Sequence, residues 1–156
     1  YSPRTHEPAL SRFCRDMDFE PVGFNAVGDD GTAVYHTNVM MCVGEAIIVA
    51  CVDSIVDAER ARVVRAMEAD HALVPISIAQ MNAYAGNMLE LRRPGRRSLM
   101  VLSSTAYRSL DGHQLAAIEA SCELLPVNVP TIETAGGSVR CMLAEIFLPT
   151  HEGPAA

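Results

Sequence analysis

The strongest constraint on the fold is a pattern that recurs along most of the chain. Two short apolar segments joined by a turn are followed by an amphipathic helical segment and then by another short apolar segment. This ββαβ-type pattern returns about every fifty residues, a period typical of repeat architectures. Strands that alternate with helices in this way predict a mixed α+β fold. The units share the pattern but little sequence identity, so the repeat is one of structure.

Periodicity and turn residues predict the individual elements. Apolar residues at helical spacing predict helices over residues 6–17, 57–69, 78–84, 104–110 and 111–122. Short runs rich in Val, Ile, Leu and Met predict strands over residues 20–27, 33–43, 46–52, 73–77, 88–92, 98–103 and 124–129. The sequence GDDG at residues 28–31 predicts a tight hairpin turn between the first two of these strands.

The composition excludes several classes of partner. The formal net charge of −7 disfavours nucleic acid and anionic membrane surfaces. The longest apolar runs, such as residues 46–52, are too short for a transmembrane helix.

The five cysteines form no CxxC pair and no cluster with histidine, so neither a disulfide framework nor a zinc site is expected. A single domain in a reducing, cytoplasmic environment is the simplest expectation.

One segment towards the end of the chain carries a candidate nucleophile. In TAGGSVRCMLAEIFLP, residues 134–149, Gly136 and Gly137 precede Arg140 and Cys141. The glycines allow a positive φ, and the alternating apolar residues after Cys141 predict a strand that continues to residue 148. A thiol beside a guanidinium and free backbone amides is a candidate for a reactive thiolate. The alternative is a small residue in a buried strand, because free cysteines are often buried.

A second candidate group lies in YHTNVMM. On the predicted strand over residues 33–43, His36 and Asn38 would point to the same face. Histidine is well suited to general acid–base chemistry near neutral pH, and the alternative is a half-exposed strand histidine bonded to a neighbour. Gln80, Asn82 and Asn87 form a further polar set, for which helix capping and turn chemistry is the favoured interpretation.

Four motifs occur in an order that resembles a known superfamily: YHTNVMM, QMNAYAGNMLEL, VLSSTAYRSL and GGSVRCMLAEIFLP. The chain resembles the arginine deiminase and amidinotransferase (pentein) superfamily, and within it the arginine deiminase-related citrulline-utilisation hydrolases. The resemblance implies a five-bladed α/β propeller around a substrate funnel. Residues 1–150 would supply about three ββαβ-type units, the C-terminal part of the catalytic domain, and residues 151–156 would be a frayed tail.

The resemblance also implies roles for individual residues. Cys141 matches the cysteine that attacks a guanidinium or ureido carbon to give a covalent thiouronium-type adduct, and His36 matches the histidine that protonates the leaving amine. Asn38 stands where arginine deiminases carry an aspartate, and a neutral amide suits a neutral ureido group, so citrulline is the favoured substrate. We expect Asn38, Arg140 and Gly137 to contact the substrate. No metal or organic cofactor is implied.

Several alternatives and partners follow from the same resemblance. An arginine or methylarginine deiminase, an amidinotransferase and a non-catalytic binding module are the alternatives, although a binding module has no need of both His36 and Cys141. The superfamily's remaining catalytic carboxylate lies in an N-terminal half that would precede this sequence. We therefore expect a small ureido or guanidino substrate, the missing half of the same domain as partner, a possible homo-oligomer, and little activity from these 156 residues alone.

Overall fold

The computed structural model describes residues 1–146, which form a mixed α+β fold with two small sheets. The first sheet contains β1 (Met41–Val43), β2 (Ile47–Ala50) and β3 (Ala72–Pro75), in the order β1-β2-β3. β1 and β2 form an antiparallel pair, and β3 runs parallel to β2. Parallel neighbours need a crossover connection, which the helix α3 (Asp57–Glu68) supplies.

The second sheet repeats this topology. It contains β4 (Leu89–Leu91), β5 (Leu99–Ser103) and β6 (Glu123–Val127), with an antiparallel β4–β5 pair and a parallel β5–β6 pair. The helices α5 (Ser104–Ser109) and α6 (Gly112–Ser121) form its crossover. The predicted ββαβ pattern is therefore confirmed in two successive units, and the α+β class with it. Residues 1–146 contain no third sheet.

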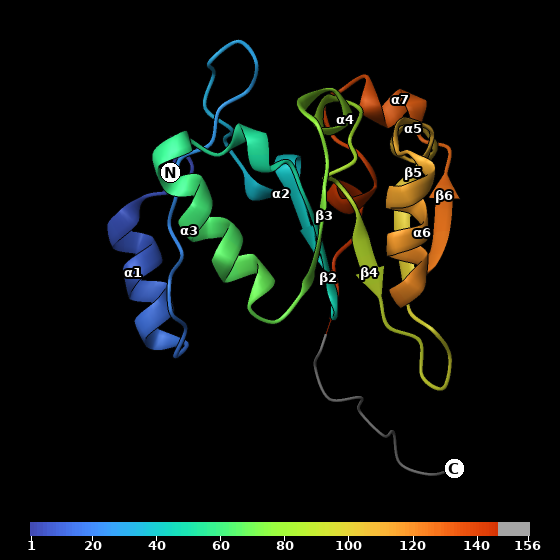
Figure 1. Cartoon of the computed structure of the whole chain (residues 1–156), viewed down its shortest axis with the longest axis horizontal. Coiled ribbons are helices and arrows are strands. Elements are labelled where there is room, and N and C mark those ends of the chain that lie inside the picture. The colour runs from blue at the N-terminus through green and yellow to red at the C-terminus, as the bar shows by residue number, and fades with distance from the viewer. Residues whose placement is uncertain (147–156) are drawn as a thin grey trace, which may run out of the picture.

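Within residues 1–146, the remaining elements are six further helical segments. They are α1 (Glu7–Asp16), α2 (Thr37–Met40), α4 (Ile78–Asn82), α7 (Pro130–Glu133) and the 3₁₀ helices η1 (Val52–Ser54) and η2 (Val139–Met142). Figure 1 shows the two sheets side by side, with α4 and α7 near each other at one end. β1 contacts β4, and α6 contacts both β6 and β3, so these elements join the two units.

Apolar side chains from both units form one continuous core. Its fully buried members include Met40, Val49, Met88, Met100, Leu102 and Ile118. Four methionines, Met40, Met81, Met88 and Met100, are buried in it, whereas Met142 is 47% exposed. Burial also raises the pKa of Cys42 to about 12 and of Cys122 to about 11, so these thiols stay protonated in the core.

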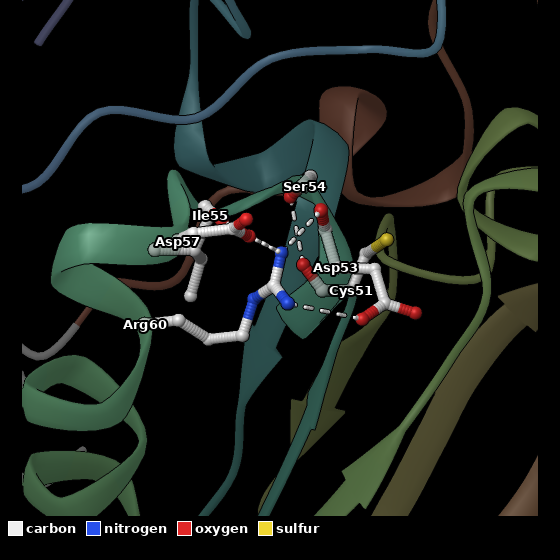
Figure 2. A network of polar contacts seen from close by, with 6 residues as sticks. All are labelled: Cys51, Asp53, Ser54, Ile55, Asp57 and Arg60. Atoms are coloured by element: carbon white, nitrogen blue, oxygen red, sulfur yellow. Dashed lines mark hydrogen bonds and ion pairs between the residues drawn. The ribbon is translucent and has the colours of Figure 1, made fainter.

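Arg60 links the start of α3 to the segment over residues 53–55 by hydrogen bonds and an ion pair (Figure 2). Its Nη2 atom lies 2.7 Å from a carboxylate oxygen of Asp57 and donates hydrogen bonds to the carbonyls of Asp53 and Ile55. In the same turn the Ser54 hydroxyl donates to the Cys51 carbonyl over 2.7 Å. These bonds hold η1 against the start of α3. Because η1 directly follows β2, they also fix the end of β2, where the Cys51 N–H bonds to the Met40 carbonyl at the end of α2.

Three predicted strands are wrong. Residues 33–43 form a strand only from Met41, because the backbone N–H of Asn38 bonds to the His36 ring and turns residues 37–40 into α2. Residues 20–27 form only the isolated bridges Ala26–Ile55 and Val27–Ala33. The segment at Cys141 is the 3₁₀ helix η2, and no strand follows within residues 143–146. The predicted tail, residues 151–156, lies outside the described residues.

No helix within residues 1–146 has the length and apolar character needed to cross a membrane. Nor does any group of three or more His, Cys, Asp or Glu side chains within this part of the chain form a possible metal site.

Candidate functional site

A cavity of about 340 Å³ lies where the two units meet. It is lined by Arg4, Tyr35, His36, Asn38, Val39, Met81, Asn82, Tyr84, Asn87, Gly136 and Cys141. The fold thus brings His36, Asn38 and Cys141 to one cavity from segments that are far apart in the sequence. Of the residues predicted for the site, Gly137 and Arg140 are not among those that line it.

His36 is held at the N-cap of α2. Its Nδ1 atom accepts a hydrogen bond of 3.2 Å from the backbone N–H of Asn38. The other end of α2 is fixed to the first sheet, because the N–H of Cys51 donates to the Met40 carbonyl over 2.9 Å. An accepting Nδ1 assigns the proton of the neutral ring to Nε2. His36 therefore lines the cavity in a defined neutral tautomer, whose Nε2–H can donate a hydrogen bond to a ligand.

Cys141 lies in η2 behind a glycine turn. Gly136 has φ of +87°, a conformation that side chains disfavour, and it reverses the chain ahead of the cysteine. A Cβ atom at Gly137 would lie 3.4 Å from the Cys141 Cβ and 3.5 Å from its Sγ. The second glycine therefore leaves one side of the thiol clear. Cys141 is exposed, whereas the other four cysteines are buried.

A buried carboxylate supports the start of this loop. Glu133 accepts hydrogen bonds from the hydroxyls of Thr105 at 2.7 Å and Ser138 at 2.9 Å. Burial alone would raise the pKa of Glu133, but the hydroxyl bonds outweigh it, so that this pKa lies below its ordinary value. The charged carboxylate thus ties α7 and α5 to the segment that leads into η2.

Arg140 faces away from the cavity. Its Nη1 atom donates to the Met88 carbonyl over 3.3 Å, and the side chain lines a second hollow together with Glu90 and Glu145. Only the backbone N–H of Arg140 reaches towards the site, where it donates to the Asn87 side chain over 3.1 Å. The guanidinium therefore lies away from the substrate-binding position that the sequence suggested, and Glu145 does not line the cavity either.

Several lining residues were not predicted from the sequence. Arg4 supplies a fixed positive charge, and its guanidinium carbon lies 4.9 Å from the centre of the Tyr35 ring. Asn82 and Asn87 were interpreted as capping and turn residues, although both reach the cavity. For Gln80 that interpretation is confirmed, because it forms a capping box with Ser77. No local signal marks Arg4, since its position depends on contacts with residues some thirty places along the chain.

The cavity lining combines a thiol, an imidazole, several amides and one guanidinium, that of Arg4. A thiol and an imidazole on one cavity are the groups needed for nucleophilic attack followed by protonation of a leaving group. The volume suits a small molecule of amino-acid size.

Comparison with known families gives one match along almost the whole chain. The family model described as "N,N dimethylarginine dimethylhydrolase, eukaryotic" matches residues 1–148. No curated protein matches the sequence.

Solved structures with a similar fold include those of ArgZ and AgrE. The apo structure of ArgZ, an arginine dihydrolase from the ornithine–ammonia cycle in cyanobacteria, is 12% identical, with a TM-score of 0.71 over 96% of this chain and 23% of its own. The ternary complex of AgrE with ornithine and NAD⁺ is 13% identical, with a TM-score of 0.74 over 97% of this chain and 21% of its own.

The N-terminal domain of ArgZ bound to its substrate is 14% identical, with a TM-score of 0.66 over 90% of this chain. At such identities the likeness shows the fold alone. The chain spans 47% of that domain and 23% of the apo ArgZ chain.

Proposed function

The chain belongs to the eukaryotic N,N-dimethylarginine dimethylhydrolase family, and on this premise we propose that it is part of a cysteine-dependent hydrolase of non-peptide C–N bonds. This family lies within the pentein superfamily that the motifs predict, so the predicted superfamily is confirmed. The observation that carries the proposal is the meeting of His36 and Cys141 on one cavity.

In the proposed reaction the Cys141 thiolate attacks the central carbon of a guanidinium or ureido group. The C–N bond breaks as His36, in its imidazolium form, delivers the Nε2 proton to the leaving amine, and a thiouronium-type adduct remains on sulfur. His36 then takes a proton from water, whose oxygen attacks the adduct carbon and releases the thiolate. Nδ1 can accept the Asn38 N–H only while the ring is neutral, so this hydrogen bond opens when His36 becomes the imidazolium.

Two substrate classes are supported by different observations. Family membership favours a methylated arginine, which would give citrulline and an alkylamine. The neutral amide of Asn38 on the cavity favours a neutral ureido group such as that of citrulline, which would give ornithine, ammonia and carbon dioxide. Both classes share a backbone of amino-acid size, and Arg4 is the cation that would hold its carboxylate. Gly137 and Arg140 would contribute through the loop that presents Cys141.

The remaining parts of the proposal concern the whole protein. We place residues 1–150 in the C-terminal part of a pentein catalytic domain, whose five-bladed propeller and third catalytic carboxylate would be completed by a further segment. This part of the proposal is supported by the length of the match, because the chain spans only 47% of the ArgZ N-terminal domain. A non-catalytic binding module is the alternative.

The test is an assay of the complete natural protein with dimethylarginine, arginine and citrulline, with product identification. We expect turnover of one class, loss of activity by at least about a thousandfold in Cys141→Ala, and near-normal activity in Met142→Ala. Met142 is the exposed neighbour of Cys141 in the same turn and is a matched control. Turnover that survives Cys141→Ala, or ligand binding without turnover in the unaltered protein, would contradict the proposal.

A further inference from the structure

We propose that Asn87 is a positioning residue whose side-chain amide joins the His36 segment to the Cys141 segment and aims an N–H at the Cys141 sulfur. The inference deepens the proposed function, because it concerns the same thiol. It assigns a role to a residue that the sequence alone presented as part of a turn.

The amide of Asn87 is buried and fully engaged. The residue is 5% exposed, and its Nδ2 atom donates to the Asn38 carbonyl over 3.1 Å. The same nitrogen lies 3.4 Å from the Cys141 Sγ, nearer than Oδ1, which lies 3.8 Å from that sulfur and accepts the backbone N–H of Arg140 over 3.1 Å. One side chain thus contacts three backbone or side-chain groups, from the α2 segment and from η2, on either side of the cavity.

These partners fix which end of the amide faces the sulfur. Arg140 presents an N–H, which can only donate, and Asn38 presents a carbonyl, which can only accept. If the amide were turned over, its NH₂ group would face the Arg140 N–H and its oxygen would face the Asn38 carbonyl. Both contacts would be repulsive and buried, and buried polar groups without partners are costly. The orientation that satisfies both backbone groups is the one that directs an N–H to Cys141.

A close backbone approach brings the amide to this position. A Cβ atom at Gly86 would lie 2.6 Å from the Val39 oxygen and 2.6 Å from the Met40 carbonyl carbon. Only a residue without a side chain lets the turn after α4 press against the backbone of α2 in this way. Asn87, the next residue, is thereby held within hydrogen-bonding distance of Asn38.

The chemical consequence concerns the charge on sulfur. An N–H donor stabilises a thiolate more than a thiol, since hydrogen bonds to charged groups are the stronger ones. In Asn87→Asp a carboxylate of the same shape would replace the donor with an acceptor and place a like charge beside the sulfur. The thiolate would then form only at higher pH.

The experiment measures how the rate of alkylation of Cys141 by iodoacetamide depends on pH, in the complete natural protein and by peptide mass spectrometry. The reagent attacks the thiolate, so the rate follows the thiolate fraction. We expect the pH at half-maximal rate to rise by about one unit or more in Asn87→Asp, equal to an approximately tenfold slower rate below that midpoint. Asn87→Ala, which removes the donor without adding charge, is expected to shift in the same direction by less.

Asn128→Asp is the matched control, because Asn128 is exposed and outside the cavity, and the substitution adds the same charge. If the pH at half-maximal alkylation rate is the same in both Asn87 variants as in the control, the inference is overturned. If this pH rises in the Asn87 variants and not in the control, the inference is supported. Since Asn87→Ala adds no buried charge, it keeps the test decisive if Asn87→Asp does not fold. Alkylation needs no substrate, so the two proposals can fail separately. If the alkylation midpoint shifts in the Asn87 variants but the unaltered protein shows no turnover, the proposed hydrolase is contradicted and the role of Asn87 is supported.

Discussion

The hydroxyl of Tyr84 donates a hydrogen bond of 2.6 Å to the backbone carbonyl of Glu133. Tyr84 has φ of 66°, an uncommon conformation for a large side chain, at the turn that ends α4. The bond joins this turn to α7, from which the chain runs through Gly136 to Cys141. The two walls of the cavity are therefore connected at their bases as well as through Asn87.

Replacing Glu133 by Gln should lower stability in a pH-dependent way. The pKa of Glu133 is lowered in the folded chain, so its carboxylate stabilises the fold above its ordinary pKa of 4.5. That contribution is lost as the pH falls through the lower, folded-state pKa. At pH 7 we expect a loss of about 1.5–3 kcal/mol, because the lost bonds go to a charged group, and a smaller difference at about pH 3.

Denaturant unfolding at several pH values measures this effect. Glu119→Gln is the control, since Glu119 is an exposed carboxylate on α6. A stability difference for Glu133→Gln that is the same at both pH values would show that the charge of Glu133 has no part in it.

Gly86→Ala should destabilise the fold. The added methyl group would meet the backbone of α2 at 2.6–2.8 Å, and backbone atoms cannot move aside as a flexible side chain can. Overpacking of this kind typically costs about 1–3 kcal/mol. Gly112→Ala is the matched control, because a Cβ atom there has no neighbour within 4 Å. Equal midpoints of denaturant unfolding for the two variants would contradict the close approach.

Arg4→Gln should raise KM for amino-acid substrates by about 10- to 100-fold with a much smaller change in kcat, if Arg4 holds the carboxylate. The measurement compares each substrate with its analogue that lacks the α-carboxylate, for which the variant and the unaltered protein should be alike. Arg12→Gln, at an exposed ion pair on α1, is the control. An equal loss for substrate and analogue would mean that Arg4 does not bind the carboxylate.

The sequence predicted the parts of the fold that local patterns govern. The hairpin–helix–strand order was recovered because the apolar strand Ile47–Ala50 and the amphipathic helix Asp57–Glu68 each carry their own signal. The strand at His36 was predicted wrongly, because Val, Tyr and Thr favour strands while a single bond between the His36 ring and the Asn38 N–H decides the conformation.

Some residues of the candidate site could likewise be proposed from the sequence, and others could not. His36 and Cys141 could be proposed from their residue types and motifs, and the structure places both on one cavity. Asn87 and Glu133 could not, since their partners are contacts across the fold that no local pattern encodes. Arg140 was favoured because it adjoins Cys141 in sequence, yet in a 3₁₀ turn neighbouring side chains point in different directions.

The central claim, that Cys141 is the nucleophile, is tested most directly by rapid-quench mass spectrometry of the complete natural protein mixed with its substrate. We predict that the peptide containing Cys141 gains the mass of the amidine or ureido adduct before product accumulates, and that His36→Ala changes how fast this adduct forms or decays. Steady turnover with no adduct on Cys141 at any time, and with activity retained in Cys141→Ala, would contradict the account.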